Sequence, residues 1–496
     1  MWPSRIIIVG GGTAGWLAAL MLGDAARRAG AAPAITVVES TKFGTIGVGE
    51  GTTAVFRMML KRLGLDEMEF LAATEATIKF GIRHRDWRRL GHCYDGPIDD
   101  PHLVAGLGGL PLLDAAQVAA GRRVGETHLF QHLIDGAKSP FALRDGRCIP
   151  AGPFHHAFHF DQALAGKYLK TKAGSVALID DQVTGVQTGD AGIAALTLES
   201  GRRVEGDFFI DCSGFRRALI GPLGAEWVGY GDVLPVNRAM PFWIDIPEGE
   251  EIDPVTLAWA QGAGWMWKIP TATRYGCGYV YSDRHTTPDQ AKTEIEQALG
   301  HEIFPRNDIK INAGRLNRSW IGNCVALGLA SSFLEPLEAT SIHGTVVQLM
   351  LMAALIGQGD ASARFNETAA RQVDDFRDFI RLHYVSERRD TPFWRDVAAS
   401  HPAAVTEKVD IWADKMPDAQ DFRPFPMGLP HVEAQLYTPV LDGLGLLSAS
   451  VAQARLGADP RPAQAARALI SEYRGAARQC IGHRAFLTSL HQKAAT

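Results

Sequence analysis

The chain has 496 residues, of which 46% are hydrophobic and 21% are charged. Its 50 lysines and arginines against 55 aspartates and glutamates give a formal net charge of −5. This balance is typical of a globular protein with about two or three structural units, and it excludes disordered and fibrous classes. Binding to a phosphate backbone would need a clustered basic surface, so no nucleic-acid partner is expected.

The six cysteines show no CxxC spacing, which favours free thiols in a reducing compartment over a disulfide framework or a zinc site. The longest apolar stretch, residues 346–357, is too short to span a bilayer. The first nine residues leave no room for a secretion signal. We therefore expect a cytoplasmic protein without a membrane span.

The first forty residues predict a strand–helix–strand unit. A buried-strand pattern at 6–9 precedes a glycine cluster, an amphipathic helix over about 14–29 and a second strand that ends at Glu39. The glycines of the GxGxxG pattern are Gly10, Gly12 and Gly15. Such glycines allow a tight turn and a close approach of backbone amides to a pyrophosphate, and the final acid can bind a ribose. This fingerprint predicts a dinucleotide site but does not distinguish NAD from FAD.

Later segments favour FAD and a helical C-terminal region. Residues 175–183, 193–200 and 207–215 are predicted as strands of a β-meander that returns to a buried strand. That order suits an FAD-binding, two-dinucleotide-fold flavoprotein. No second GxGxxG follows a strand, so the reductant is expected to come from another protein. Residues 343–496 are predicted to be mostly helical.

Seven motifs follow one another from residue 10 to residue 394: GGGTAGW (10–16), IGVGEGTT (46–53), TIKFGIRHRDW (77–87), DCSGF (211–215), GWMWKIP (264–270), ALGLASSFLEPLEATSIH (326–343) and LHYVSERRDTPFW (382–394). In this combination and order they strongly resemble the flavin-dependent halogenases of the tryptophan halogenase family.

The resemblance implies a reaction in two places. Reduced FAD reacts with O₂ in one site, and a halide attacks the distal oxygen of the resulting flavin hydroperoxide. The hypohalous acid formed passes through a tunnel to an aromatic substrate. Lys79 matches the family's catalytic lysine, which holds the halogen beside the ring as a hydrogen-bonded acid or a haloamine. From the residues alone, Lys79 could instead pair with Glu75 on a surface helix.

Glu338 matches the family's active-site glutamate, which stabilises the cationic ring and helps to remove its proton. On physical grounds Glu338 could equally be an acid that stabilises the start of a helix near Thr340, and both roles can hold together. The backbone amides of Thr340 and Ser341 match the halide site, because a helix N-terminus suits an anion.

Trp265 and Trp267, two apart on a predicted strand, place both indoles on one face. They match the family pair that keeps the substrate away from the flavin, although an aromatic strand that packs a core would look the same. Further expected cofactor contacts are Thr13, Ala14, Gly49, Glu50, Val183, Gly328, Leu329 and Ile342. No metal is expected: His155, His156 and His159 lack a supporting acid or cysteine.

The chain departs from the family pattern at two turns. Leu329 stands where many flavoproteins of this fold have an aspartate for the ribityl hydroxyls, which predicts loosely held FAD. Ala339 and Ser341 replace residues of the family's usual halide turn, so bromide is a candidate beside chloride. No binding site for the headgroup of free tryptophan can be transferred, and any indole-type substrate remains compatible.

Together these features predict an α/β protein. Residues 1–345 would form a GxGxxG flavoprotein domain with a β-meander, and 346–496 a mainly helical substrate-side module. The predicted function is FAD-dependent halogenation with a separate flavin reductase, O₂, a halide and an indole-type substrate, and the family makes a homodimer plausible. The alternatives are an aromatic monooxygenase, which would need neither Lys79 nor halide, and a flavin-binding protein without turnover.

Overall fold

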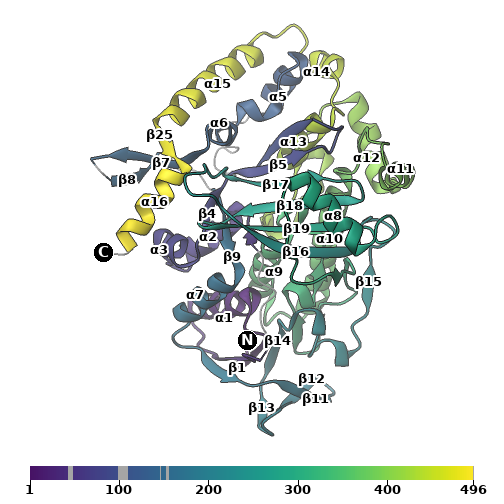
Figure 1. Cartoon of the computed structure of the whole chain (residues 1–496). Coiled ribbons are helices and arrows are strands. Elements are labelled where there is room, and N and C mark those ends of the chain that lie inside the picture. The colour runs from purple at the N-terminus through teal and green to yellow at the C-terminus, as the bar shows by residue number, and fades with distance from the viewer. Residues whose placement is uncertain (43–48, 99–109, 146, 152–155, 495–496) are drawn as a thin grey trace.

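The computed structural model describes residues 1–42, 49–98, 110–145, 147–151 and 156–494. Figure 1 shows an α/β molecule in which a parallel sheet lies at one end and a second, larger sheet lies beside it. Helices cover both sheets and form most of the C-terminal third, as predicted. Among the described residues, no helix has the length and apolar character that a membrane crossing requires.

The first sheet has six strands in the order β10-β2-β1-β14-β23-β22. The first five run parallel, and β22 pairs antiparallel with β23. Residues 6–9 of β1 are all buried, which fits a strand covered on both faces. The strands are β1 (Arg5–Val9), β2 (Ala34–Glu39), β10 (Ala177–Asp180), β14 (Phe208–Asp211), β22 (Trp320–Ile321) and β23 (Cys324–Ala326).

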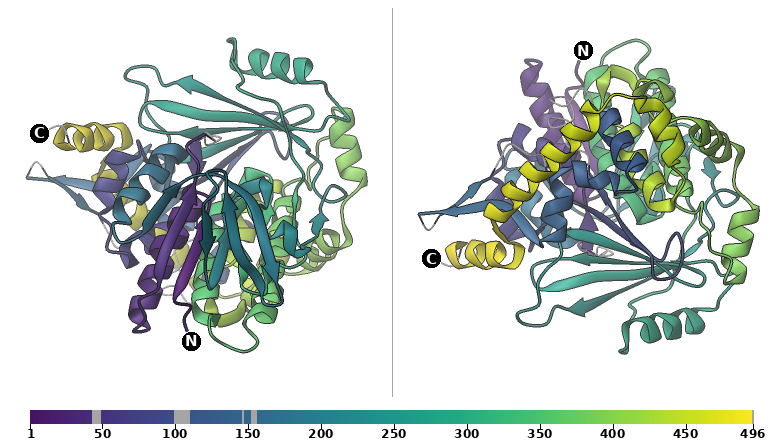
Figure 2. Two further views of the ribbon diagram at one scale, coloured as in Figure 1. Left: turned by 90° about the horizontal axis from the view of Figure 1, so that it is seen from below. Right: turned by 90° about the horizontal axis from the view of Figure 1, so that it is seen from above.

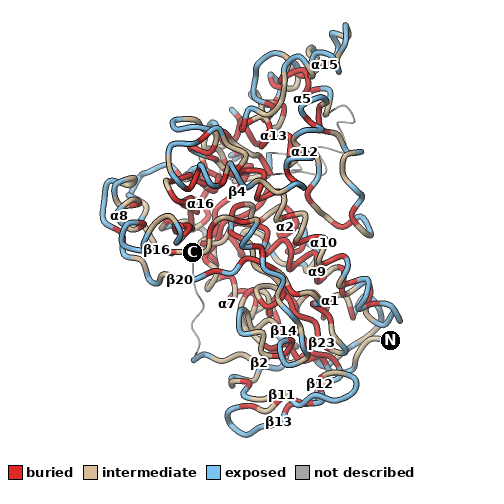
Figure 3. Tube along the Cα trace, turned by 90° about the vertical axis from the view of Figure 1, so that its right-hand side faces the viewer, coloured by how far each residue is buried: buried red, intermediate tan, exposed pale blue. Residues whose placement is uncertain are grey.

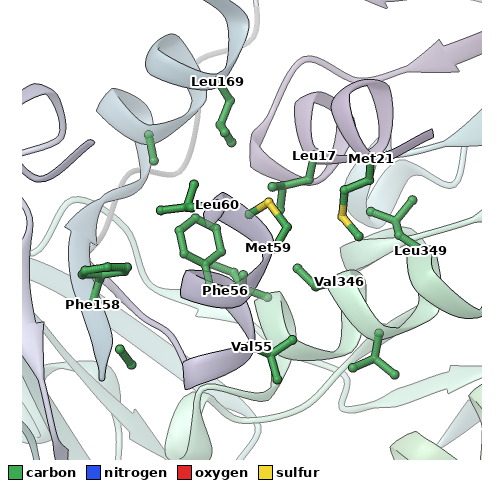
Figure 4. Close-up of a cluster of buried hydrophobic side chains, with 14 of the residues drawn as sticks. Leu17, Met21, Val55, Phe56, Met59, Leu60, Phe158, Leu169, Val346 and Leu349 are labelled. Atoms are coloured by element: carbon green, nitrogen blue, oxygen red, sulfur yellow. The ribbon is translucent and has the colours of Figure 1, made fainter. Parts of the chain in front are cut away.

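The predicted strand–helix–strand unit is confirmed. Helix α1 (Thr13–Arg28) follows β1 and leads to β2, whose last residue is Glu39. Its apolar side packs against helices from distant parts of the chain, and Figure 4 shows Leu17 and Met21 in contact range of this shared core. The other contributors are α2 (Ala54–Arg62), α7 (Gln162–Lys172), α9 (Thr340–Leu355) and strand β9 (Ala157–Asp161).

The β-meander is present, but it begins one strand later than predicted. Residues 177–180, expected in the meander, instead add β10 to the edge of the parallel sheet. The meander is the antiparallel sheet β11 (Val183–Gly189), β12 (Gly192–Leu198) and β13 (Arg203–Glu205), which projects at the bottom of Figure 1. The turn at residues 181–182 separates the two sheets, and a pattern of apolar residues alone could not show which sheet each strand joins.

The second large sheet has seven strands in the order β20-β16-β19-β18-β17-β5-β6, and only its β17–β5 pair is parallel. Its strands are β5 (Gly81–Arg85), β6 (Cys93–Pro97), β16 (Arg238–Asp245), β17 (Val255–Ala260), β18 (Gly264–Pro270), β19 (Arg274–Tyr281) and β20 (Ile309–Lys310). A small sheet next to it, β3-β9-β4, carries β3 (Gly49–Gly51) and β4 (Thr77–Lys79) on either side of β9.

The C-terminal region is helical apart from the short strand β25 (Cys480–Gly482), which pairs with β7 (Lys138–Arg144). The predicted boundary at 345 and 346 falls inside α9, whose buried residues belong to the core around α1. The helices that follow are α10 (Ala361–Leu382), α11 (Pro392–Ala399), α12 (Ala403–Asp414), α13 (Ala434–Leu444), α14 (Ala449–Leu456), α15 (Arg461–Gln479) and α16 (His483–Ala494).

The remaining elements cover these sheets or connect them. Figure 2 shows α15 lying along α5, so the chain's last third packs onto an earlier segment, and Figure 3 shows the buried residues concentrated along α1, α9, α10 and the sheet strands. The remaining helices and strands are α3 (Glu67–Ala73), α5 (Leu110–Ala119), α6 (Leu129–Asp135), α8 (Pro288–Leu299), β8 (Arg147–Pro150), β15 (Trp227–Gly229), β21 (Gly314–Leu316) and β24 (Ser332–Phe333).

Trp267 of β18 lies flat over Gly278 of the neighbouring strand β19, and the two residues are paired in register. A Cβ at Gly278 would lie 2.0 Å from the Trp267 ring. We therefore expect Gly278→Ala to lower the free energy of unfolding by about 1–3 kcal/mol, the usual cost of overpacking a core. Urea unfolding measures this loss. The control is Gly174→Ala, whose Cβ would meet nothing within 4 Å; equal losses in both variants would contradict the packing argument.

Candidate functional site

The predicted dinucleotide site is a cavity of about 450 Å³ at the carboxyl ends of β1 and β2. The three residues Gly10, Gly11 and Gly12 line it. A Cβ at Gly10 would lie 2.2 Å from the Cys212 carbonyl oxygen, and one at Gly15 would lie 1.8 Å from the Gly10 carbonyl oxygen. Both glycines are therefore required for packing, whereas a Cβ at Gly12 would meet nothing within 4 Å and faces open space.

The start of α1 fits an anionic group. Gly12 caps the helix without a side-chain hydrogen bond, and the first turn carries no acid. The buried hydroxyl of Thr13 has no hydrogen-bond partner among the described residues. Free backbone amides at a helix N-terminus attract phosphate. These features fit the pyrophosphate of a dinucleotide.

The rest of the cavity wall combines predicted and unpredicted residues. Glu39 and Val183, both predicted to contact the cofactor, line it, and Lys170 of α7, which also lines it, makes an ion pair with Glu39. Cys212 belongs to the same wall, and burial, followed by the nearby Asp211 carboxylate, raises the pKa of its thiol well above the usual value. Lys170 offers a positive charge that the glycine motif alone did not indicate.

A second, much smaller hollow lies at the start of α9. Gly328, Thr340 and Ser341 line it, whereas Leu329 and Ile342 do not. A Cβ at Gly328 would lie 3.0 Å from Cβ of Ala14, so this turn approaches the start of α1 closely. The sequence-based prediction that Gly328 belongs to the cofactor region is consistent with this approach. Gly49 and Glu50 lie apart from it on β3.

The turn that leads into α9 leaves backbone amides open. Ala339 caps the helix in the left-handed region, with φ 52°, and among the described residues no side chain bonds the cap. The first turn of α9 carries no acid. Thr340 and Ser341 thus begin a helix whose positive end can accept a small anion.

Lys79 lies at the end of β4 and is 1% exposed. The alternative in which Lys79 pairs with Glu75 on a surface helix is wrong, because Lys79 is in a strand and Glu75 accepts a hydrogen bond from Thr273. Burial lowers the pKa of Lys79 to about 8, and the carboxylates of Glu338 and Glu50 limit the decrease. Burial also raises the pKa of Glu50 to about 7, against the opposing effect of Lys79.

Lys79 and Glu338 line one cavity of about 460 Å³. Its wall is otherwise mostly apolar and comes from α2, β5, β6, α10 and the segment before α13. The apolar wall residues are Ala54, Val55, Met58, Ile82, Pro97, Ile98, Phe376, Phe379, Pro424, Phe425, Leu429, Pro430, Val432 and Leu436. His343, His431 and Glu433 also reach the wall.

Glu338 ends the short turn Pro336–Glu338 just before α9. Its Oε1 lies 2.9 Å from Nε2 of His383 and 3.5 Å from Nε2 of His84. Burial alone would raise the pKa of Glu338, but the contacts with His383 and His84 outweigh it and lower the pKa to about 2. The carboxylate is therefore ionised at neutral pH and lies at the cavity wall.

Trp265 and Trp267 are on one face of β18 as predicted, with ring centroids 6.4 Å apart. Neither indole lines a described cavity, and both pack in a buried cluster that contains Leu337, the residue before Glu338. The Trp265 indole N–H donates to Oε2 of Glu335 at 2.7 Å, and the Tyr384 hydroxyl donates to the same oxygen at 2.6 Å. Burial raises the pKa of Glu335 to about 7.

Sequence reasoning missed four residues of this region: His84, Glu335, His383 and Tyr384. All four stand inside motifs that carry the family resemblance, but their pairing joins segments far apart in the chain, so no local pattern indicated it. His84, Glu338 and His383 also form a group whose ligand atoms lie within 4.8 Å of one another and could hold a metal ion.

The histidines first considered as a metal cluster do not form one among the described residues. His156 contacts Glu67, and His159 contacts Thr77 and Thr256. His155 lies outside the described residues.

The glycine-lined cavity on a parallel sheet, the β-meander beside it and the separate lysine-bearing cavity together define a flavoprotein of the dinucleotide-fold class. The family model described as tryptophan halogenase matches residues 5–447. The chain therefore belongs to the tryptophan halogenase family, whose members bind a flavin.

Comparison with individual proteins agrees. Tryptophan 6-halogenase SttH of Streptomyces toxytricini is 34% identical, with 93% of each chain covered. Its crystal structure matches with a TM-score of 0.86 over 98% of this chain and all of its own. Tryptophan 7-halogenase RebH of Lentzea aerocolonigenes is 34% identical over 82% of this chain and 81% of its own. The flavin-dependent halogenase BrvH from Brevundimonas sp. BAL3 superposes with a TM-score of 0.83 at 32% identity, covering 98% of this chain and 99% of its own.

The buried ammonium of Lys79 should reduce stability. Its pKa falls from the ordinary 10.5 to about 8 on folding, so up to about 3 kcal/mol of folding free energy is lost below pH 8. The loss shrinks as pH rises from 8 to 10.5, because the unfolded chain then holds a proton that the folded chain has released. We expect Lys79→Met to be more stable than the wild type at pH 7 and to lose this advantage toward pH 10.

Urea unfolding of both proteins at several pH values measures the difference. The control is Lys61→Met, which changes an exposed lysine on α2 and is expected to stay within about 0.5 kcal/mol of the wild type. A Lys79→Met variant that is less stable than the wild type at pH 7 would contradict the inference that the buried ammonium of Lys79 destabilises the folded protein.

Proposed function

We propose that the protein is an FAD-dependent halogenase that takes reduced FAD from a separate flavin reductase and uses O₂ and chloride or bromide. Hypohalous acid formed near the flavin would travel to Lys79, which delivers the halogen to an indole-type ring. The observation that carries this proposal is that Lys79 and Glu338, from distant segments, meet at one apolar cavity, separate from the glycine-lined cavity.

Gly10, Gly12, Thr13, Ala14, Gly15 and Glu39 are proposed to hold the pyrophosphate and ribose of FAD, with Val183 near the adenine. Gly49, Glu50, Gly328, Leu329 and Ile342 are proposed for the remainder of the cofactor. When bound and reduced, FAD would supply the electrons that reduce O₂ to the peroxide level, and this activated oxygen would oxidise the halide. The amides of Thr340 and Ser341, at the uncapped start of α9, would hold the halide.

Lys79 suits the capture of an electrophilic halogen. With a pKa of about 8, its side chain is mainly an ammonium at pH 7 and carries a substantial amine fraction slightly above it. The ammonium can donate a hydrogen bond to hypohalous acid, and the amine can form a haloamine. Both forms place the halogen in the cavity that holds the aromatic ring.

Glu338 would stabilise the positive charge that forms on the ring and take its proton. Its low pKa keeps the carboxylate ionised when the cation develops, and an ionised group already in place costs no reorganisation at that moment. Trp265 and Trp267 are proposed to keep substrate away from the flavin, and Trp265 would also hold the segment before Glu338 through its hydrogen bond to Glu335.

The cavity favours a flat, apolar aromatic substrate. Residues after 346 supply much of its wall, including Phe376, Phe379 and Phe425, which supports the proposed substrate-side role of this region. Aromatic and aliphatic walls bury an indole ring well.

Replacing Lys79 distinguishes halogenation from direct oxygen transfer. We expect Lys79→Ala to oxidise reduced FAD at the wild-type rate but to give no halogenated product, because the halogen carrier is lost. Mass spectrometry of indole and free tryptophan, incubated with FAD, a generic flavin reductase, NADH, O₂ and chloride or bromide, reads the product. Lys61→Ala serves as the control. Addition of an oxygen atom without halogen in the wild type would favour the monooxygenase alternative instead.

Removing the charge of Glu338 should slow substitution without loss of the fold. We expect Glu338→Gln to reduce the halogenation rate by about 10²-fold, the scale for one preorganised electrostatic group. Circular dichroism and FAD binding check that the variant is folded. Turnover equal to that of the wild type would remove Glu338 from the mechanism.

A further inference from the structure

A histidine from the far end of the chain reaches the strand that carries Lys79. His483 is the first residue of α16, is 0% exposed and donates its backbone N–H to the Ala137 carbonyl oxygen at 2.9 Å. Its imidazole bonds both to Ile78, the residue before Lys79, and to Ile252, three residues before β17. His483 lies outside every motif that carries the family resemblance, and the proposed function gives it no role.

The two bonds of the imidazole fix its tautomer. The Ile78 N–H donates to Nε2 of His483 at 3.0 Å, and Nδ1 lies 2.9 Å from the Ile252 carbonyl oxygen. A backbone N–H only donates and a carbonyl only accepts, so Nε2 offers a lone pair and Nδ1 carries the hydrogen. Burial lowers the pKa of His483 to about 4, which agrees with a neutral ring at pH 7. The ring therefore joins two backbone groups through one acceptor and one donor.

The imidazole takes the place of one hydrogen bond of a parallel ladder. Just beyond β4, the Phe80 N–H donates directly to the Pro254 carbonyl oxygen at 2.8 Å, and β5 and β17 then pair in parallel. Such bonds recur at every second residue along each strand of a parallel pair. The preceding bond would join Ile78 to Ile252, and the imidazole is inserted at this point. The ring thus separates the two backbones immediately before Lys79.

This separation lets β4 belong to a different sheet from β5. Strand β4 is the outer strand of the small sheet β3-β9-β4, in which Lys79 pairs in register with Ala157 of β9. Without His483, the outer edge of β4 would leave the N–H of the fully buried Ile78 without a partner, which is costly. The imidazole satisfies this N–H and holds the edge of β4 at a fixed distance from Ile252.

The end of the Lys79 side chain has little room to adapt to a shift of its strand. Lys79 is 1% exposed, and a Cβ at Gly51 of β3 would lie 3.2 Å from its Nζ. Lys79 also has to reach the cavity wall that it shares with Glu338. Because β4 is only three residues long, a displacement of the backbone at Ile78 would carry Lys79 with it.

We propose that His483 is a positioning residue for Lys79: its imidazole sets the distance between β4 and the segment before β17, and so fixes where the lysine meets the halogen and the aromatic ring. This inference rests on the proposed function and deepens it. A misplacement of about 1 Å at a reacting group can cost about 10²-fold in rate. The alternative is that His483 only anchors α16.

Two amide side chains separate these roles. The amide of His483→Gln reaches the position of Nε2 and can accept from the Ile78 N–H. The shorter amide of His483→Asn reaches only the position of Nδ1 and keeps only the bond to Ile252. Hydrogen–deuterium exchange of residues 77–80 reads the bond to Ile78. We expect faster exchange than in the wild type for His483→Asn and wild-type exchange for His483→Gln.

Halogenation of indole in the full FAD system reads the position of Lys79. We expect His483→Asn to oxidise reduced FAD at the wild-type rate with little change in KM for indole. The halogenated indole formed per reduced FAD should fall by about 10–100-fold, because the carrier is displaced from the ring. His483→Gln should restore most of the product. Loss of stability alone would not separate flavin oxidation from halogenation in this way.

The control is Phe486→Leu, which loosens the same helix α16. The Phe486 ring stacks on Phe141 with centroids 4.5 Å apart, and its replacement leaves both imidazole bonds of His483 in place. We expect wild-type product yield and wild-type exchange of residues 77–80. A yield as low as that of His483→Asn would make the effect one of helix docking and overturn the positioning role.

Other outcomes also overturn the positioning role of His483. They are equal product yields in His483→Asn and His483→Gln, and unchanged exchange of residues 77–80 in His483→Asn. No halogenated indole from the wild type would instead overturn the proposed function and this inference with it.

NMR of the wild type with ¹⁵N-labelled histidine tests the bridge without a variant, should His483→Asn not fold. Nε2 of His483 should resonate as a nitrogen without a proton, and Nδ1 as a protonated one. The opposite tautomer, or a ring protonated on both nitrogens at pH 7, would overturn the proposal.

Discussion

The burial of one positive charge constrains the centre of this molecule. Lys79 is held 1% exposed at the end of a three-residue strand, and an ammonium there is tolerable only because carboxylates lie nearby. Glu338 and Glu50 supply that compensation. The positions of β3, β4 and the turn before α9 are therefore coupled electrostatically, and two of these elements, β4 and the turn, reach the cavity wall through Lys79 and Glu338.

The same turn connects the Lys79 cavity with the small hollow at the start of α9. Residues 336–338 end at the wall of the Lys79 cavity, and α9 begins two residues later at a hollow near Gly328 and the start of α1. A single short segment thus contributes a carboxylate to one side and backbone amides to the other. Under the proposed function, this arrangement would place oxidant formation and aromatic substitution on opposite ends of one short segment.

Local patterns predicted the elements whose signal lies in neighbouring residues. The strand–helix–strand unit around Gly12, the two tryptophans on one strand face and the start of α9 follow from spacing alone. The sequence could not show which sheet residues 177–180 join, because the pattern of apolar residues does not indicate which strand is their neighbour. The contacts of Glu338 with His84 and His383 were also not predicted, because only tertiary packing brings β5 and the end of α10 together.

The state of the cysteine thiols affects how well the protein resists oxidation. All six cysteines are free, and Cys212 forms part of the wall of the glycine-lined cavity. Thiolates are the form that oxidants attack, and the raised pKa of Cys212 keeps its sulfur protonated. Because Cys212 borders this cavity, its protonated sulfur stays in the least nucleophilic state of a thiol, which slows its oxidation.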